Sequence, residues 1–265
     1  MKLVCLAIAF FPVVSYGTSG LPAQKKPPSK PPADNVIHVA AAADMQPVFE
    51  ALGPYFERKT GLHLAITFGS SATLSQQVEA NAPQDIFFSA DYVFAEKIVS
   101  AGLADSTDAI PYAKGLLVLW TRNGSPYSPL HLEALESKNL HSVAIANPEH
   151  APYGRAAMAA LRKMNFYGNV APHLVQAESV AQAAQFAQSG NAELALISKT
   201  IAVSPKFKTA GTFVLFPTYA YPDIRQCAVV LKSSKQSKGA HKLLDYMLSD
   251  EVQMHLSDLG LNRIK

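Results

Sequence analysis

Apolar residues recur along the chain in two alternating patterns, one typical of buried strands and one typical of amphipathic helices. Short runs that are apolar at nearly every position predict strands covered on both faces. The predicted strands span residues 36–43, 63–69, 85–90, 116–121, 142–147, 194–198, 212–216 and 226–232. Their alternation with helical segments predicts an α/β chain in which the sheet is mainly parallel.

The helical segments carry apolar residues three and four positions apart. The first segment has one apolar stripe, and Gly61 follows it as a helix-ending residue. The stripe consists of Met45, Val48, Phe49, Leu52, Tyr55 and Phe56. Five further helices are predicted over residues 71–80, 153–165, 179–190, 239–248 and 250–259. Strands and helices together fill most of the chain after residue 35, and they contain no internal repeat.

Composition bounds the size and class of the protein. With 265 residues, 49% of them hydrophobic, the chain is long enough for one or two globular domains with a buried core. The formal charge is +3, but four of the 23 basic residues (Lys2, Lys25, Lys26 and Lys30) lie within residues 1–32, which contain no acid. The other 19 basic residues are balanced by 20 acidic residues, which gives no support for a nucleic-acid-binding surface.

The N-terminus has the pattern of a secretory signal. Lys2 is followed by an apolar run over residues 3–14 and by small residues at positions 15 and 17. This run is too short to span a bilayer, which requires about 20 residues. We therefore expect residues 1–17 to be a cleaved signal peptide that exports the protein to the periplasm. Residues 18–35, which include a stretch rich in Pro and Lys, are expected to form an extended tether.

Four predicted helices begin in a way that suits anion binding. Each follows a strand or a short loop and opens with small or hydroxyl-bearing residues, at positions 43–44, 69–71, 152–154 and 179–180. The first N–H groups of a helix lack partners within the helix and carry partial positive charge, so a helix start can hold an anion. Ordinary capping explains any single start. Four starts that converge at the carboxyl ends of strands would form one anion site.

Several segments resemble periplasmic molybdate-binding proteins, and they do so in sequence order. The most specific block runs from Phe68-Gly-Ser-Ser-Ala-Thr-Leu74 through residues 77–85 to Phe88-Ser-Ala-Asp91. The opening strand and turn, two later turns, the strand near the C-terminus and the final helices also match. These further matches are Val36-Ile-His-Val-Ala-Ala-Ala-Ala-Asp-Met45, Asn147-Pro-Glu-His-Ala-Pro-Tyr-Gly154, Ala177-Glu-Ser-Val180 and Ala228-Val-Val-Leu-Lys-Ser233. The chain is thus identified as a member of this family from Val36 to its end.

The resemblance implies a fold and a division of the chain. The implied fold is α/β, a two-lobed periplasmic-binding-protein fold of type II with the ligand in the cleft between the lobes. We expect lobe 1 to comprise residues 36–113 plus 226–265, and lobe 2 to comprise residues 114–225. The chain would then cross between the lobes near Lys114 and Arg225.

The resemblance also implies a set of oxyanion-binding residues. Carried over by position, the hydroxyl and N–H of Ser71 hold one oxygen of molybdate. The backbone N–H groups at Asp44, Tyr153 and Val180 hold others. In part of the family a tyrosine on the strand entering the second lobe also binds the ligand, and Tyr112 occupies that position. Donors alone would match a dianion that only accepts hydrogen bonds, without burying a cationic side chain.

Two positions depart from the family pattern. Many members have serine where this chain has Asp44. A carboxylate directed at a dianion would repel it, so we expect the side chain of Asp44 to cap its own helix while its N–H faces the ligand. Ser198 stands where some members bind through a tyrosine, and it is either a shorter donor or not a ligand. His150 lies in the turn before the third helix start, where a structural role competes with a modulating one.

The function implied by the resemblance is high-affinity binding of molybdate for delivery to the membrane permease of an ABC transporter. Tungstate, which has similar size and charge, is expected to bind as well. The protein is expected to be a monomer that needs no cofactor, coordinates no metal directly and binds no nucleic acid. Sulfate or another oxyanion is the alternative ligand.

Two other classes of function remain as alternatives. A hydrolase that uses Ser71 as its nucleophile is disfavoured, because the residues around Ser71 do not form a Gly-x-Ser-x-Gly elbow. A regulatory effector domain of the same fold would need a DNA-binding segment ahead of it. In this chain the predicted signal and tether occupy that place.

Overall fold

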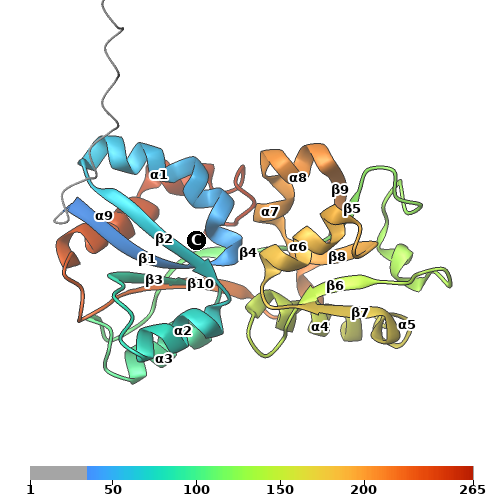
Figure 1. Cartoon of the computed structure of the whole chain (residues 1–265), viewed down its shortest axis with the longest axis horizontal. Helices are drawn as coiled ribbons and strands as arrows, with labels where there is room; N and C mark the ends of the chain where they lie inside the picture. Colours follow the sequence, from blue (N-terminus) through green and yellow to red (C-terminus); the bar gives the residue numbers. More distant parts are fainter. Residues whose placement is uncertain (1–34, 265) are drawn as a thin grey trace, which may run out of the picture. The chain divides into compact units, whose positions relative to one another are not determined.

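A computed structural model describes residues 35–264 of the chain, which contain two five-stranded sheets with helices packed on them (Figure 1). The predicted signal segment, and all but the last residue of the predicted tether, lie outside these residues. Within the described part of the chain, no helix combines the length and apolar character that crossing a membrane requires.

The first sheet has the strand order β2-β1-β3-β10-β4. Its strands are β1 (Val36–Ala42), β2 (His63–Gly69), β3 (Ile86–Ser89), β4 (Ile110–Gly115) and β10 (Ile224–Val230). β1 pairs in parallel with β2 and β3, whereas β10 pairs antiparallel with β3 and β4. The three parallel strands end on the same edge, and the predicted helix starts follow two of them.

Helices cover both faces of the first sheet, and a separate apolar cluster lies under each layer. One layer contains α1 (Gln46–Thr60), α9 (Ser237–Leu248) and α10 (Asp250–His255). The other layer contains α2 (Ser71–Glu79) and α3 (Tyr92–Ser100). A short 3-10 helix, η2 (Ala43–Met45), joins β1 to α1. Burial on both faces accounts for the apolar sequence of β3 and for that of β1 apart from the exposed His38.

The second sheet has the strand order β7-β6-β8-β5-β9. Its strands are β5 (Leu117–Arg122), β6 (Val143–Ala146), β7 (Leu174–Ala177), β8 (Leu194–Ser198) and β9 (Gly211–Leu215). β6 pairs in parallel with β7 and β8, and β5 pairs antiparallel with β8 and β9. Its helical elements are η3 (Leu132–Glu136), α4 (Pro152–Lys163), α5 (Tyr167–Val170), η4 (Ala171–His173), α6 (Val180–Ser189), α7 (Lys199–Val203), α8 (Pro205–Ala210) and η5 (Thr218–Ala220).

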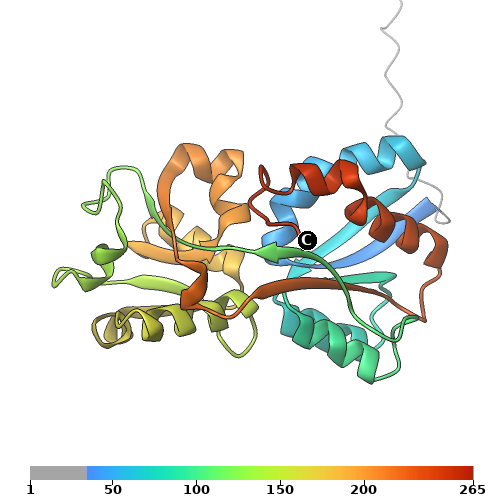
Figure 2. The same ribbon diagram turned by 180° about the vertical axis from the view of Figure 1, so that it is seen from behind.

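The chain passes between the two sheets twice, and both connections are visible in Figure 2. It leaves the first sheet at the end of β4 and enters the second at β5, then returns from β9 through η5 to β10. Lys114 and Arg225, the predicted crossing points, are direct register partners on β4 and β10. The predicted residue bounds of the two lobes stay a prediction.

The prediction of a mainly parallel sheet is wrong. Each sheet has two parallel and two antiparallel strand pairings. The antiparallel pairings all involve β5 or β10, the two strands that follow a crossing between the sheets. Parallel neighbours in a sheet are joined by a crossover connection, usually a helix. β5 and β10 each follow a connection from the other sheet instead, so they can run antiparallel to their neighbours.

Several elements were not predicted, for reasons visible in their sequences. β4 contains Pro111 and Lys114, which interrupt an apolar run, and β7 has four residues of which only one is buried.

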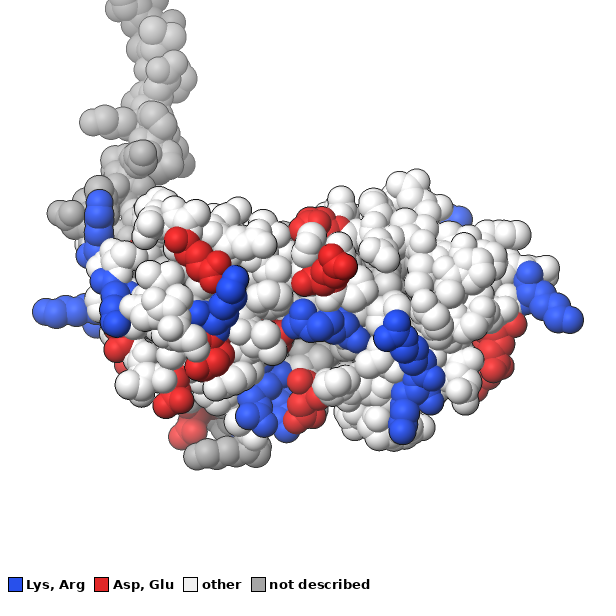
Figure 3. All heavy atoms as spheres, turned by 90° about the horizontal axis from the view of Figure 1, so that it is seen from below, with Lys and Arg blue, Asp and Glu red and all other residues white. Residues whose placement is uncertain are grey.

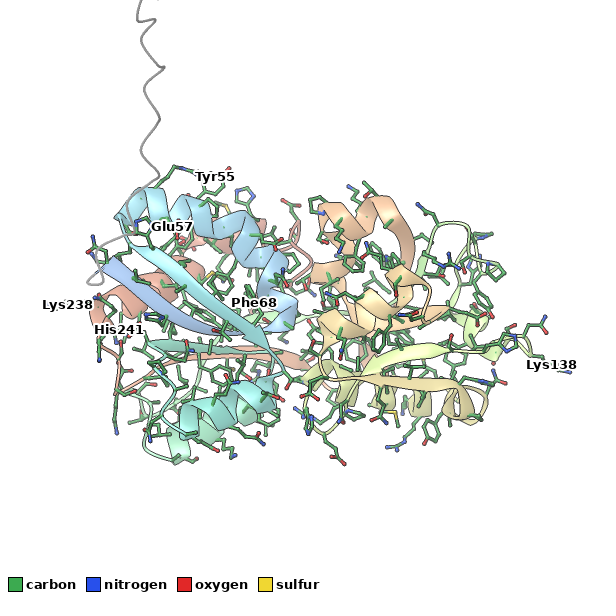
Figure 4. All side chains as sticks on the ribbon, in the orientation of Figure 1. Tyr55, Glu57, Phe68, Lys138, Lys238 and His241 are labelled. Atoms are coloured by element: carbon green, nitrogen blue, oxygen red, sulfur yellow. The ribbon has the colours of Figure 1, made fainter. Side chains whose placement is uncertain are left out.

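Two predicted helices differ from the structure in detail. In α1, Tyr55 belongs to the predicted apolar stripe but is 60% exposed and projects outward (Figure 4), with Arg58 over its ring. The predicted helix over residues 250–259 ends at His255.

Candidate functional site

The structure brings the four predicted helix starts together around one small cavity. These starts belong to η2, α2, α4 and α6, so they come from both sheets. The cavity has a volume of about 10 Å³, enough for roughly one water molecule. It is lined by Ala42, Ala43, Asp44, Gly69, Ser70, Ser71, Ala90, Ala151, Pro152, Tyr153, Ser179 and Val180. Four of the six predicted binding residues are therefore part of its wall.

The start of α2 directs donors at the cavity. Ser70 is the N-cap, and its Oγ accepts a hydrogen bond of 3.2 Å from the N–H of Thr73. Ser71 follows as the first helical residue and is 1% exposed. Its Oγ accepts from the N–H of Ala90 at 3.1 Å, so the hydroxyl proton of Ser71 remains available to another acceptor. Capping by Ser70 thus leaves Ser71 free to act as a donor.

The starts of α4 and α6 approach the cavity from the second sheet. α6 is capped by Ser179, whose Oγ accepts from the N–H of Gln182 at 3.3 Å. α4 has no side-chain cap, and Pro152 occupies its first position. A Cβ on Gly154 would lie 2.8 Å from the carbonyl carbon of Asn147, so only glycine allows the first turn of α4 to pack this closely on the end of β6.

The cavity wall supplies backbone N–H groups. Among residues 35–264, the N–H groups of Ser71, Tyr153 and Val180 donate to no acceptor outside their own helices. Each lies in the first turn, where a helix provides no acceptor, and each adds the positive end of a helix dipole. Lys and Arg alternate with Asp and Glu on the face shown in Figure 3, so no broad basic patch dominates that face.

The start of η2 is different, and one expectation about it is wrong. η2 has no side-chain cap, so Asp44 does not cap its own helix. The carboxyl of Asp44 is instead 0% exposed, and its Oδ2 accepts a hydrogen bond from Nε2 of Gln226. Its other oxygen, Oδ1, is buried and has no hydrogen-bond partner among the described residues. A buried acceptor therefore stands in a wall made otherwise of donors and apolar groups.

Gln226 organises a buried polar network that the sequence analysis missed. Its Oε1 accepts from the hydroxyl of Tyr112 at 2.6 Å, and its Nε2 contacts the hydroxyl of Tyr153 at 3.4 Å in addition to Asp44. The signal for it was a glutamine at the start of an otherwise apolar predicted strand. The register of β10 against β4 shifts between Gln226 and Cys227, and such an irregularity re-aims a side chain.

Burial determines the protonation of this network. It raises the pKa of Asp44 to about 6, although the hydrogen bond from Gln226 and the nearby polar groups of Tyr153 and of its own backbone favour the ionised form and oppose the rise. Burial and then the charge of Asp44 raise the pKa of Tyr112 and of Tyr153 well above the usual value, so both hydroxyls stay neutral. Asp44 is thus the member of the network that can change its charge near neutral pH.

Tyr112 and Ser198 are not part of the cavity wall. Tyr112 is completely buried and reaches the cavity only through Gln226 and Asp44. Ser198 caps α7, with its Oγ accepting from the N–H of Ile201 at 3.4 Å. The Ser198 hydroxyl also lies 2.8 Å from that of Thr200, which donates to the backbone oxygen of Asp44 at 2.7 Å. Both predicted residues are therefore linked to Asp44 at the start of η2, Tyr112 through Gln226 and Ser198 through Thr200.

Contacts between the two halves of the wall close the cavity. The N–H of Ala72 donates to the backbone oxygen of His150 at 3.1 Å, and the Thr73 hydroxyl donates to Glu178 at 3.1 Å. The ring of His150 in turn lies 3.2 Å from a carboxylate oxygen of Glu178. A third link is the ion pair between Asp91, the N-cap of α3, and Arg155 on α4. We call the three links between the halves (Ala72 to His150, Thr73 to Glu178 and Asp91 to Arg155) the closing contacts.

Other hollows and clusters fit the sequence pattern less well. A hollow of about 250 Å³ lies between α1, α6 and the α7–α8 turn, but it contains none of the predicted binding residues. In the described part of the chain, no group of three or more His, Cys, Asp or Glu side chains is arranged to hold a metal ion.

Comparisons with known proteins agree with this architecture. A family model described as "Bacterial extracellular solute-binding protein" matches residues 37–262. The molybdate-binding protein ModA of Rhodobacter capsulatus is 33% identical over 84% of this chain and 86% of its own length. The putative ABC transporter substrate-binding lipoprotein YvgL of Bacillus subtilis is 27% identical over 84% of this chain and 85% of its own. The solved structure of the Azotobacter vinelandii periplasmic molybdate-binding protein superposes with a TM-score of 0.80 at 28% identity, covering 86% of this chain and 100% of that one.

Proposed function

Because the chain belongs to the bacterial extracellular solute-binding protein family, we propose that it binds molybdate and delivers it to the permease of an ABC transporter. The observation that carries the proposal is the convergence of four helix starts on one small cavity. Similarity to molybdate-binding relatives supports the choice of ligand.

The chemistry of the wall suits a tetrahedral oxyanion. At neutral pH molybdate is a dianion whose oxygens only accept hydrogen bonds, and most of the polar groups of the wall are donors. We propose that the Ser71 hydroxyl and the N–H groups of Ser71, Tyr153 and Val180 bind its oxygens, with the backbone of Asp44 nearby. A charge-assisted hydrogen bond contributes about 1.5–3 kcal/mol net, so four or five of them support tight binding after ordering costs.

The ligand requires more room than the cavity has. A four-oxygen anion is larger than the single water molecule that about 10 Å³ can hold. We expect the two halves of the wall to move apart slightly when the anion enters, while the closing contacts re-form around it. Tungstate, with nearly the same size and charge, should bind comparably, and the smaller sulfate should leave donors poorly matched.

A panel of oxyanions tests the proposal. The mature protein is mixed in turn with sodium molybdate, tungstate, sulfate and phosphate, and the melting temperature is measured. At a ligand concentration of about 100 times Kd, binding stabilises the folded state by roughly 2.7 kcal/mol, which corresponds to a shift of several degrees. A shift with sulfate or phosphate but none with molybdate or tungstate would show that the ligand is another oxyanion.

The remaining features of the proposal follow from the same role. A binding protein of this kind is exported, acts as a monomer and turns nothing over, and we propose each of these for the chain. The surroundings of Ser71 support the absence of catalysis, because its Oγ accepts a hydrogen bond from Ala90 and no histidine lines the cavity among the described residues. Turnover of generic esters in a Ser71-dependent manner would contradict this.

A further inference from the structure

The carboxyl of Asp44 is an unusual group to find in the wall of an anion site. Asp44 lines the cavity and is 0% exposed. Gln226 satisfies Oδ2, while Oδ1 has no partner among residues 35–264. An ionised carboxylate with a free oxygen would face a dianion at short range in a medium of low polarity, where like charges repel strongly. Binding a dianion therefore requires a change at Asp44.

No neighbouring cation compensates this charge. Within the described residues, no ion pair involves Asp44. The groups around it are neutral. Gln226 from β10 donates to its carboxyl, Tyr112 from β4 and Tyr153 from α4 contact Gln226, and the Thr200 hydroxyl from α7 donates to its backbone oxygen.

None of the charged residues on the surrounding elements, within residues 35–264, forms an ion pair with Asp44. Arg155 of α4 pairs with Asp91, and Lys114 of β4 pairs with Asp223. Helix α6, which packs on η2, carries no charged residue. His150 and Glu178, near the cavity mouth, pair with each other. A proton is therefore the remaining source of compensating charge.

We propose that Asp44 takes up one proton when the oxyanion binds, and that the protonated carboxyl donates a hydrogen bond from Oδ1 to a ligand oxygen. This inference rests on the proposed function, since it concerns the same anion site. Asp44 is then a specificity-determining residue. Its protonation converts a buried acceptor in the wall into a further donor, and it ties affinity for a dianion to pH.

The protonation of the free protein supports this proposal. Burial raises the pKa of Asp44 to about 6, so at neutral pH the carboxyl is mostly ionised but easily protonated. A bound dianion favours the neutral acid and raises this pKa further. Between the free and bound pKa values, binding takes up a proton, and affinity must fall as pH rises. Below the free pKa, Asp44 already carries the proton and affinity becomes independent of pH.

Calorimetry on the unmodified mature protein tests the proton directly. Sodium molybdate is titrated at about pH 7.5 in two buffers with different ionisation enthalpies, and the difference in heat gives the number of protons exchanged. We expect close to one proton taken up per molybdate bound. A value near zero, with binding intact, overturns the inference. Absence of binding at every pH from 6 upward overturns the proposed function instead.

A pH series with variants identifies the group. From about pH 6 to 8.5, Kd for molybdate should rise about tenfold per pH unit in the unmodified protein. In Asp44→Asn, the amide oxygen can accept from Gln226 and the amide nitrogen can donate to the ligand, so Kd should be nearly independent of pH. Histidine side chains also change charge in this pH range, so His150→Gln serves as the control. If Asp44 is the group that takes up the proton, His150→Gln keeps the full slope. Glu149→Gln, which removes an exposed carboxylate from the same loop as His150, should also keep it.

These variants separate the possible sources of a pH effect. If the slope disappears in His150→Gln and persists in Asp44→Asn, the proton binds at His150 and the inference is wrong. If Asp44→Asn fails to fold, the proton count of the unmodified protein and the slope of His150→Gln still decide the matter.

Discussion

The starts of α2 and η2 line the same cavity, yet they present opposite chemistry to an anion. At α2, Ser70 caps the helix and Ser71 keeps a hydroxyl and an N–H available. At η2, no side chain caps the helix, and Asp44 brings a buried carboxyl held by Gln226. The geometry of a helix start is common to both. We infer from this difference that the side chain at the helix start, and the residues that hold this side chain, decide whether the site accepts a dianion directly.

The largest effect is expected when the support behind Asp44 is removed. Gln226→Leu leaves the carboxyl of Asp44 and the hydroxyl of Tyr112 buried without their main partner. We expect the free energy of unfolding at pH 7 to fall by about 3–5 kcal/mol, measured by urea denaturation. Gln185→Leu, which changes an exposed glutamine on α6, should cost less than about 0.5 kcal/mol. Equal losses in the two variants would show that the network contributes little to stability.

A second effect concerns stability and pH in the absence of ligand. The pKa of Asp44 is raised from 3.8 to about 6 on folding, so the folded state binds the proton more tightly than the unfolded state. Stability from this group is full below pH 4 and is lost as pH rises through 6, by about 3 kcal/mol in total. Asp44→Asn lacks this loss. The stability of the variant relative to the unmodified protein should rise by about that amount between pH 4 and pH 8. A constant difference across this range would contradict the assignment.

A smaller effect tests the other side of the comparison. Ser71→Ala removes one donor from the cavity, and Kd for molybdate should rise at least about tenfold, equivalent to about 1.4 kcal/mol. Ser75→Ala makes the same change one turn later, at a buried hydroxyl that does not line the cavity. Ser198→Ala removes the cap of α7. Both should leave Kd within about twofold, and Ser198→Ala should lower stability by about 1 kcal/mol. Unchanged affinity in Ser71→Ala, measured by titration calorimetry, would remove the central role of this residue.

Local features of the site could be predicted from the sequence. Capping involves residues within four positions of each other, so the sequences around Ser70 and Ser179 are sufficient to predict two helix starts. The largely apolar runs predicted β1, β3 and β8, because burial on both faces requires apolar residues at most positions of a strand. Strands β4 and β7 contain no such run, since one is interrupted by Pro111 and the other is mostly half-buried or exposed.

Long-range features could not be predicted in this way. Gln226 and Asp44 are 182 positions apart, and no local pattern connects them. The expected cap at Asp44 failed for the same reason: a carboxyl near a helix start normally accepts from the first turn, but here a side chain from β10 holds it. Tyr112 was placed at the ligand because it follows a family pattern, whereas the structure inserts Gln226 between it and the cavity.

The closing contacts have a consequence for the time an anion stays bound. Ala72 and His150, Thr73 and Glu178, and Asp91 and Arg155 all join the two halves of the wall. An anion enclosed by them cannot leave until at least some of them break, however weak or strong its own hydrogen bonds are. Residence time is then set by how often the halves separate. A transporter that pulled the halves apart would empty the protein quickly without having to compete for the anion.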